Sequence, residues 1–211
     1  MTALVVIAKQ PVPGRVKTRL QPEYSADEAA TLAAALISDT LATARTVRAD
    51  RHILFYAGDV LPPGAGAFEV IAQPDGTLGE RIGYLFDLMD EPTVLIGMDT
   101  PQFSLGHLGG TFPAWPSGVG AVIGPAEDGG WWTLGMRQPD GDMVRGVPTS
   151  RADTGQRQLA ELHQADLVVS LLPVLLDVDD SASAHRVSDL VPNGAFASTL
   201  RRLDSRAMTA A

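Results

Sequence analysis

Four cationic side chains lie close together in the first part of the sequence, at Lys9, Arg15, Lys17 and Arg19. Residues 1–22 contain no Asp or Glu, and Lys9 and Lys17 are the only lysines in the sequence. Arginine can bind a phosphate group through two parallel hydrogen bonds, whereas lysine binds it as a point charge. Gly14 allows backbone N–H groups to approach the same anion closely. This loop is therefore a candidate polyphosphate site, and the alternative is a solvated basic loop without a ligand.

Carboxylates that follow apolar segments indicate a metal site. Asp99 comes at the end of the apolar run 93–97, and Asp128 comes after a second run at 119–124. The sequence has no cysteine, so a metal ion must be held by oxygen or imidazole ligands. Mg²⁺ and Mn²⁺ prefer oxygen, and they typically take one or two protein carboxylates together with phosphate groups.

Asp99 is the first candidate ligand, because the buried strand expected before it would be a rigid mount. The second carboxylate is expected to be Asp128, or else Asp177 or Asp179. Turn interpretations also exist for both motifs, since an Asp before Thr-Pro can cap a turn and Asp-Gly-Gly can connect two strands. The four histidines lie far apart in the sequence and show no metal-ligand spacing.

Composition and missing motifs exclude several classes of protein. The net charge of −9 and the pI of about 4.8 argue against a protein that binds nucleic acid by neutralising many phosphates. The apolar runs are too short for a transmembrane helix and no signal-peptide pattern is present, so we expect a cytoplasmic protein. The sequence also lacks the GxxxxGK[ST], GxGxxG, HExxH and GxSxG motifs of other enzyme classes.

Apolar periodicity predicts strands that alternate with helices. Strands are expected at residues 3–8, 52–57, 68–72, 93–97, 119–124 and 131–136. A long helix is expected from the capping box of Ser25 and Glu28 to about residue 47. Further helices are expected at 79–90, 153–165 and 193–206, and the apolar stretch 167–176 is interrupted by Pro173.

This alternation, without a linker or repeat, predicts one α/β domain over residues 1–211 with a mostly parallel sheet. The core is expected at about residues 3–190, and a C-terminal helix at 193–206. Ligands of such sheets bind outside the carboxyl ends of the strands. The loop after residue 8, Asp99 and Asp128 all fall at those ends, so we expect the functional site there.

Several motifs in the sequence match a known pattern. Residues 8–20 follow A-K-x-P-x-P-G-x-V-K-T-R-L throughout. The match continues at Gln73, Gly76, Leu78, Gly79 and Arg81, at Gly97-Met-Asp-Thr-Pro101, and at Gly124-Pro-Ala-Glu-Asp-Gly-Gly130. Over about residues 3–190, the sequence resembles a bacterial glycosyltransferase-like family of the nucleotide-diphospho-sugar transferase superfamily, some of whose members are assigned to arsenosugar biosynthesis. The resemblance implies the GT-A fold, a Rossmann-like three-layer sandwich with a mostly parallel mixed sheet.

The resemblance also implies a metal-dependent glycosyltransferase that moves a sugar from a nucleotide-sugar donor to a small-molecule acceptor. The basic loop, with Gly14, would bind the diphosphate. Asp99 and Asp128 would hold Mg²⁺ or Mn²⁺ and serve catalysis. Gly76, Gly79 and Arg81 would bind the base and ribose of the nucleotide, although this segment can also be read as a simple helix entry.

Two departures from the family pattern fall where an acceptor could bind. Trp131-Trp132 replaces the usual tyrosine pair, and Pro148-Thr149-Ser150 replaces the common Trp-Ser-Thr. We therefore consider Trp131, Trp132 and Ser150 as contacts for a sugar or acceptor. Adjacent strand residues face opposite ways, so at most one of the two tryptophans would face the cleft, and both can be core residues.

Two other functions remain open. The string Val16-Lys-Thr-Arg-Leu20 also resembles the loop of phospholactate guanylyltransferases, in which a phosphorylated substrate attacks a nucleoside triphosphate and pyrophosphate leaves. A nucleotide-binding protein without turnover is the third hypothesis.

Overall fold

The computed structural model describes the backbone of residues 1–210 and the side chains of residues 1–207. In this part of the chain, seven strands form one sheet in the order β3-β2-β1-β4-β6-β5-β7. They are β1 (Ala3–Lys9), β2 (Arg51–Ala57), β3 (Glu69–Ala72), β4 (Thr93–Gly97), β5 (Ala121–Pro125), β6 (Trp131–Met136) and β7 (Val169–Leu171). β6 runs antiparallel to β4 and β5, and the other neighbouring strands are parallel. The expected mostly parallel mixed sheet is confirmed.

The central strands are buried on both faces, which explains why their sequences are continuously apolar. Along β1, Leu4 and Val6 belong to one hydrophobic cluster, whereas Ala3 and Val5 belong to the cluster on the opposite face. Each strand expected from the sequence is present, with ends that differ by at most about two residues. Within the apolar stretch 167–176, strand structure is limited to β7.

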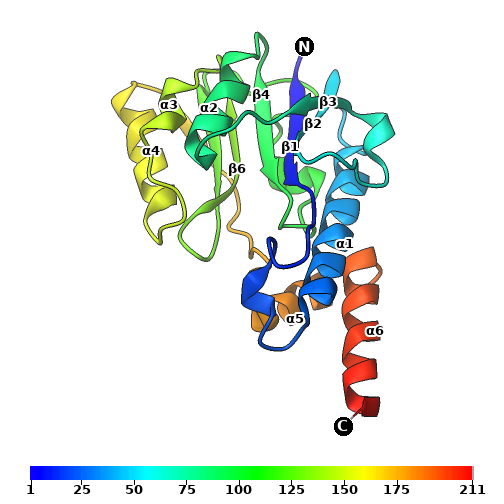
Figure 1. Cartoon of the computed structure of the whole chain (residues 1–211). Coiled ribbons are helices and arrows are strands. Elements are labelled where there is room, and N and C mark those ends of the chain that lie inside the picture. Colours follow the sequence, from blue (N-terminus) through cyan, green and yellow to red (C-terminus); the bar gives the residue numbers. More distant parts are fainter. Residues whose placement is uncertain (211) are drawn as a thin grey trace.

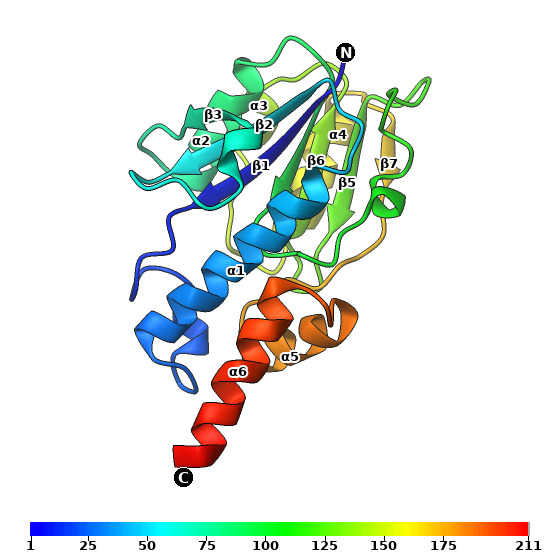
Figure 2. The same cartoon turned by 90° about the vertical axis from the view of Figure 1, so that its right-hand side faces the viewer.

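Helices cover both faces of the sheet (Figure 1). They are α1 (Ala26–Ala44), α2 (Leu78–Asp87), α3 (Asp142–Arg145), α4 (Thr154–Gln164), α5 (Ser181–Leu190) and α6 (Ala195–Ala210), with short 3₁₀ turns η1 (Thr18–Leu20), η2 (Ala65–Ala67) and η3 (Leu105–Leu108). α2, α3 and α4 lie on one face and α1 crosses the other, as Figures 1 and 2 show from two sides. This arrangement is the expected three-layer sandwich.

The long helix α1 begins where the sequence predicts. Ser25 accepts a hydrogen bond from the backbone of Glu28, and the Glu28 carboxylate accepts one from the backbone of Ser25 at 2.9 Å. The helix ends at Ala44, three residues short of the prediction. It buries two faces, because Ile37 and Leu41 pack toward the sheet while Leu32 and Leu36 pack into a separate cluster.

That separate cluster lies below the sheet and is built mainly by η1, α1, α5 and α6 (Figure 1). α5 is absent from the sequence prediction, because its buried apolar side chains, Ala184 and Val187, are too small to mark a helical stripe. The capping box of Asp180 and Ser183 was the signal that could have revealed it. The four-residue helix α3 was also missed, and α6 begins two residues later than predicted.

Asp39 of α1 fixes the start of α6. Its carboxylate oxygens accept hydrogen bonds from the backbone N–H groups of Ala195 and Phe196, both at 2.8 Å. An acid at this position also suits the positive end of the helix dipole. Among the helices within residues 1–210, none combines the length and the apolarity that a membrane span requires.

Candidate functional site

The carboxyl ends of β1, β4, β5 and β7 meet at the lower edge of the sheet in Figure 1, because these four strands point the same way. The basic loop follows β1, Asp99 follows β4, and Asp128 follows β5. The segment 175–180, here called the acidic segment, follows β7 and leads into α5. The tertiary structure thus brings together four segments that are distant in the sequence.

Two buried apolar side chains anchor the basic loop. Val16 packs with the cluster that includes α1 and the sheet, and Leu20 packs with the cluster that includes α5 and α6. Lys17 lies between them and adopts a left-handed backbone conformation, with φ 46° and ψ 42°. Such a conformation is unfavourable for a residue with a Cβ atom, so the surrounding contacts must stabilise it.

Lys17 is not a solvated loop residue, which corrects the sequence-based alternative for this position. Its side chain is only 8% exposed. Its Nζ atom lies 3.0 Å from Asp99 Oδ2 and 3.6 Å from Asp179 Oδ1, and it also donates to the carbonyl oxygen of Val178. The ammonium group therefore joins the end of β4 to the acidic segment.

The alternation of side chains along the acidic segment places its two aspartates on the site. Val178 is fully buried in the cluster formed with α5 and α6. Its backbone N–H donates to the carbonyl oxygen of Asp99 at 3.1 Å. Because successive side chains of an extended segment point to opposite sides, burial of Val178 directs Asp177 and Asp179 away from that cluster. In the sequence, the alternation Asp-Val-Asp at 177–179 is the pattern that indicates two carboxylates on the same side of an extended segment.

The carboxylates beside Lys17 have the chemistry that a divalent cation requires. Asp99 Oδ1 and Asp177 Oδ1 are both buried without a hydrogen-bond partner among the described residues. Burial, followed by the charges of Asp99 and Asp128, raises the pKa of Asp177 to about 7. No group of three or more His, Asp or Glu side chains within the described residues forms a ready metal-binding set. Two carboxylates match the usual protein share of a Mg²⁺ site completed by phosphates.

Asp128 is exposed and belongs to a turn between β5 and β6. Its Oδ1 atom accepts a hydrogen bond from the backbone of Gly130 at 2.8 Å. A Cβ atom on Gly129, where φ is +88°, would lie 1.9 Å from the carbonyl oxygen of Ala152. The turn therefore needs glycine, and it packs directly against the segment that contains Ser150 and Ala152.

The turn is also tied to α5. Arg186 donates to Glu127 from its two terminal guanidinium nitrogens, Nη1 and Nη2, each at 3.0 Å from a carboxylate oxygen. This ion pair, which the sequence analysis did not predict, ties Glu127, the neighbour of Asp128, to α5.

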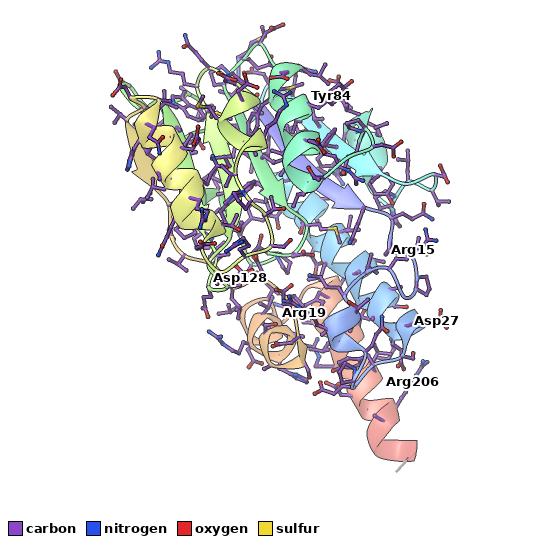
Figure 3. All side chains as sticks on the ribbon, turned by 60° about the vertical axis from the view of Figure 1, so that its left-hand side comes forward. Arg15, Arg19, Asp27, Tyr84, Asp128 and Arg206 are labelled. Atoms are coloured by element: carbon purple, nitrogen blue, oxygen red, sulfur yellow. The ribbon has the colours of Figure 1, made fainter. Side chains whose placement is uncertain are left out.

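The other cations of the basic loop are accessible. Arg19 is 76% exposed and lies 3.3 Å from Asp179 Oδ2. Lys9 is exposed, and its Nζ atom contacts the carbonyl oxygen of Arg15 at 3.4 Å. Gly14 has a φ of +76° and open space around it. Figure 3 shows Arg19 and Asp128 near α5, whereas Arg15 lies farther from α5.

The Gly76–Arg81 segment begins α2 and is connected to the end of β1. The Arg81 side chain donates to the carbonyl oxygen of Gly76 at 2.9 Å and to Gln73 Oε1 at 3.5 Å. Gln73 in turn donates to the carbonyl oxygen of Ala8, just before the basic loop, at 2.9 Å. Gly79 is buried, and a Cβ atom added to it would lie 3.5 Å from the carbonyl oxygen of Val144, which is ordinary van der Waals contact. Gly76 and Arg81 therefore stand beside the start of the basic loop.

The two tryptophans point to opposite faces, as the strand geometry predicts. Trp132 is buried to 1% exposure, donates to the carbonyl oxygen of Pro173 at 2.9 Å and contacts the rings of Phe103 and His107. It is a core residue, as the alternative interpretation expects, and it has almost no exposed surface with which to contact a sugar or acceptor. Trp131 is half-buried against the cluster on the α2–α4 face, and Ser150 is exposed.

Comparisons with known proteins agree with this architecture. Residues 29–151 match the family described as "Uncharacterized protein conserved in bacteria (DUF2064)". No curated protein matches the sequence.

Among solved structures, a protein from Desulfovibrio desulfuricans G20, provisionally named a nucleotide-diphospho-sugar transferase, is 27% identical with a TM-score of 0.79 over 97% of this chain and 95% of the other. A nucleotidyl transferase from Methanothermobacter is 14% identical, with a TM-score of 0.58 over 92% and 99%. The 2-C-methyl-D-erythritol 4-phosphate cytidylyltransferase of Thermus thermophilus is 15% identical, with a TM-score of 0.52 over 90% and 98%. The last two similarities establish the fold alone.

Proposed function

The chain belongs to the DUF2064 family, and we propose that it is a metal-dependent transferase that uses a nucleotide-sugar donor. The supporting observation is the meeting of the basic loop with Asp99, Asp177 and Asp179 at the carboxyl edge of the sheet. A nucleotide-sugar presents a pyrophosphate, which needs cations from the protein and a divalent metal ion. This edge supplies both the basic side chains and the oxygen ligands. The similarity to the Desulfovibrio protein over almost the full length of both chains favours a nucleotide-sugar as the donor.

In this proposal, Asp99 and Asp177 hold Mg²⁺ or Mn²⁺, because each has a buried carboxylate oxygen without a partner. A divalent ion, when bound, neutralises the negative charge that grows on the departing diphosphate. Asp177 takes the place that sequence analysis gave first to Asp128, which is exposed and engaged in its own turn. Asp128, which is exposed, would face the acceptor and accept its hydroxyl proton.

The cations of the loop have separate tasks in the proposal. Arg19 is the accessible guanidinium nearest to the carboxylates, so it would bind the diphosphate directly. Lys9 and Arg15, farther from Asp99, would contact the outer phosphate oxygens. Arg81 and Gly76, beside the start of the loop, would contact the nucleoside.

One observation favours a second reaction class. The loop carries four cations, which match the charge of a nucleoside triphosphate better than that of a diphosphate. A nucleotidyltransferase would use the same loop and carboxylates, with the bond broken at the α-phosphate instead of at the sugar.

The two reactions release different products, so one experiment tests both. The protein is incubated with nucleotide-sugars and nucleoside triphosphates in Mn²⁺ or in EDTA, and the release of nucleoside diphosphate and of pyrophosphate is measured. Metal-dependent release of nucleoside diphosphate supports the glycosyltransferase, and release of pyrophosphate from a triphosphate supports the nucleotidyltransferase. If no nucleotide raises the melting temperature with Mn²⁺ present, both forms of the proposal are wrong.

A further inference from the structure

The Lys17 ammonium group is enclosed by oxygen atoms of the protein. It carries three N–H donors and no acceptor. Three oxygens surround it: Asp99 Oδ2 at 3.0 Å, Asp179 Oδ1 at 3.6 Å and the carbonyl oxygen of Val178. With 8% of the side chain exposed, a phosphate group has little access to Lys17 unless the ammonium moves away from one or more of these oxygens.

Asp99 and Asp179 differ in the ion pairs that they would retain if Lys17 moved away. Asp179 would retain Arg19, whose guanidinium lies 3.3 Å away. Asp99 pairs with Lys17 and with no other cationic side chain among the described residues. Departure of Lys17 would therefore leave both Asp99 oxygens for a divalent cation. Conversely, an ammonium held against Asp99 repels such a cation in a partly buried setting, where charges are weakly screened.

We propose that Lys17 exchanges partners during substrate binding: it pairs with Asp99 and Asp179 before the donor binds and with the donor's phosphates afterwards, while the divalent cation takes over Asp99. This inference rests on the proposed function and extends it. Its consequence is that metal and nucleotide bind cooperatively, since each favours the same position of Lys17. Thermodynamic linkage requires that each ligand strengthens the binding of the other by the same factor.

Binding of Mn²⁺ alone, measured by electron paramagnetic resonance, tests the exchange without any need for turnover. Lys17→Met removes the competing charge, so this variant should bind Mn²⁺ at least about tenfold more tightly than wild type. Lys17→Arg retains the charge and should remain close to wild type. Arg19→Met is the matched control, because it removes one cation from the same loop but leaves the Asp99 ion pair, and it should strengthen Mn²⁺ binding by less than about threefold.

Nucleotide binding provides the second measurement. UDP and GDP are titrated by calorimetry into wild type and Lys17→Met, with and without Mn²⁺ and with correction for Mn²⁺ bound by free nucleotide. In wild type, Mn²⁺ should strengthen binding of the preferred nucleotide by at least about tenfold, and in Lys17→Met this factor should fall toward one.

The exchange is wrong if folded Lys17→Met, verified by circular dichroism, binds Mn²⁺ no better than wild type. If that variant does not fold, the nucleotide titrations of wild type with and without Mn²⁺ decide the proposal. Independent binding of Mn²⁺ and nucleotide to wild type would also overturn the exchange. Failure of the proposed function would give a different result: neither Mn²⁺ nor either nucleotide would then bind to wild type or to Asp99→Asn. Nucleotide binding that requires Asp99, together with unchanged Mn²⁺ affinity in Lys17→Met, would retain the function and reject the exchange.

Discussion

The backbone N–H of Val178 donates a hydrogen bond to the carbonyl oxygen of Asp99 at 3.1 Å. This bond fastens the acidic segment to the end of β4. Since Val178 is buried on the opposite side, the aspartates on either side of it are held next to Asp99 and Lys17. The carboxylate cluster is thus positioned by backbone hydrogen bonding and apolar packing in addition to its ion pairs with Lys17.

Asp99→Asn should nearly abolish transfer. The amide retains the shape of the side chain but removes the charge that a hard cation needs. We expect a loss of more than about 100-fold in turnover, because even the outer partners of metal ligands are commonly worth 10–100-fold. Product release from the preferred donor is the measurement. Asp128→Asn should also lower turnover, because it removes the proposed proton acceptor, but it should leave Mn²⁺ binding unchanged. Loss of Mn²⁺ binding in that variant would mean that Asp128 is also a direct ligand.

Asp177→Asn should stabilise the fold at high pH. The pKa of Asp177 is raised to about 7 by burial and by Asp99, whereas an unfolded Asp has a value near 4. Ionisation of this group therefore opposes folding progressively as the pH rises from about 4 to about 7. In EDTA, the variant should melt at the wild-type temperature at pH 4 and at a higher temperature at pH 8. A difference that is the same at both pH values would contradict the shifted pKa.

His185 should contribute stability on the acidic side of neutrality. Its hydrogen bond to the carbonyl oxygen of Ser181, at 2.8 Å, and its contact with Asp204, at 3.1 Å, raise its pKa, against a smaller effect of burial. The nearby Glu23 acts in the same direction. The contribution is therefore complete below the unfolded value of about 6.5 and is lost as the pH rises through the folded value.

His185→Gln tests this pH dependence. The difference in melting temperature between wild type and the variant should be largest near pH 5.5 and should shrink by pH 8.5. The effect should be small, because the imidazole is half exposed to solvent. A difference that grows with pH would have the wrong sign.

Gly129→Ala should destabilise the protein by about 3 kcal/mol or more, because it combines left-handed strain with a steric clash. The added Cβ would meet the carbonyl oxygen of Ala152 at 1.9 Å, where only the backbone could yield. Gly14→Ala is the matched control, since its φ of +76° is similar but no atom lies within 4 Å. Its cost should be about 1–2 kcal/mol. Urea unfolding measures both, and equal losses would show that the clash with Ala152 is relieved without cost.

Much of the fold could be predicted from the sequence because its signals are local. The apolar run of β1, the Ser25–Glu28 capping box and the alternation of strands and helices each depend on residues close together in the chain. The edge of the sheet that carries the site follows from the direction of parallel strands, so the basic loop and Asp99 could be placed there without coordinates. α5 was missed because its buried face is made of small residues, which give little periodic signal.

The sequence by itself determined which groups are available, namely a loop with four cations, carboxylates after the strands and no cysteine. Only the tertiary structure decided which of them meet. It buried Lys17 against Asp99 and Asp179, left Asp128 exposed in a turn and placed Trp132 in the core. These outcomes depend on contacts between segments far apart in the chain, above all the docking of Val178 and Leu20 with α5 and α6. No local pattern encodes such contacts, because burial of a charge is decided by what packs over it and by the partners it finds there.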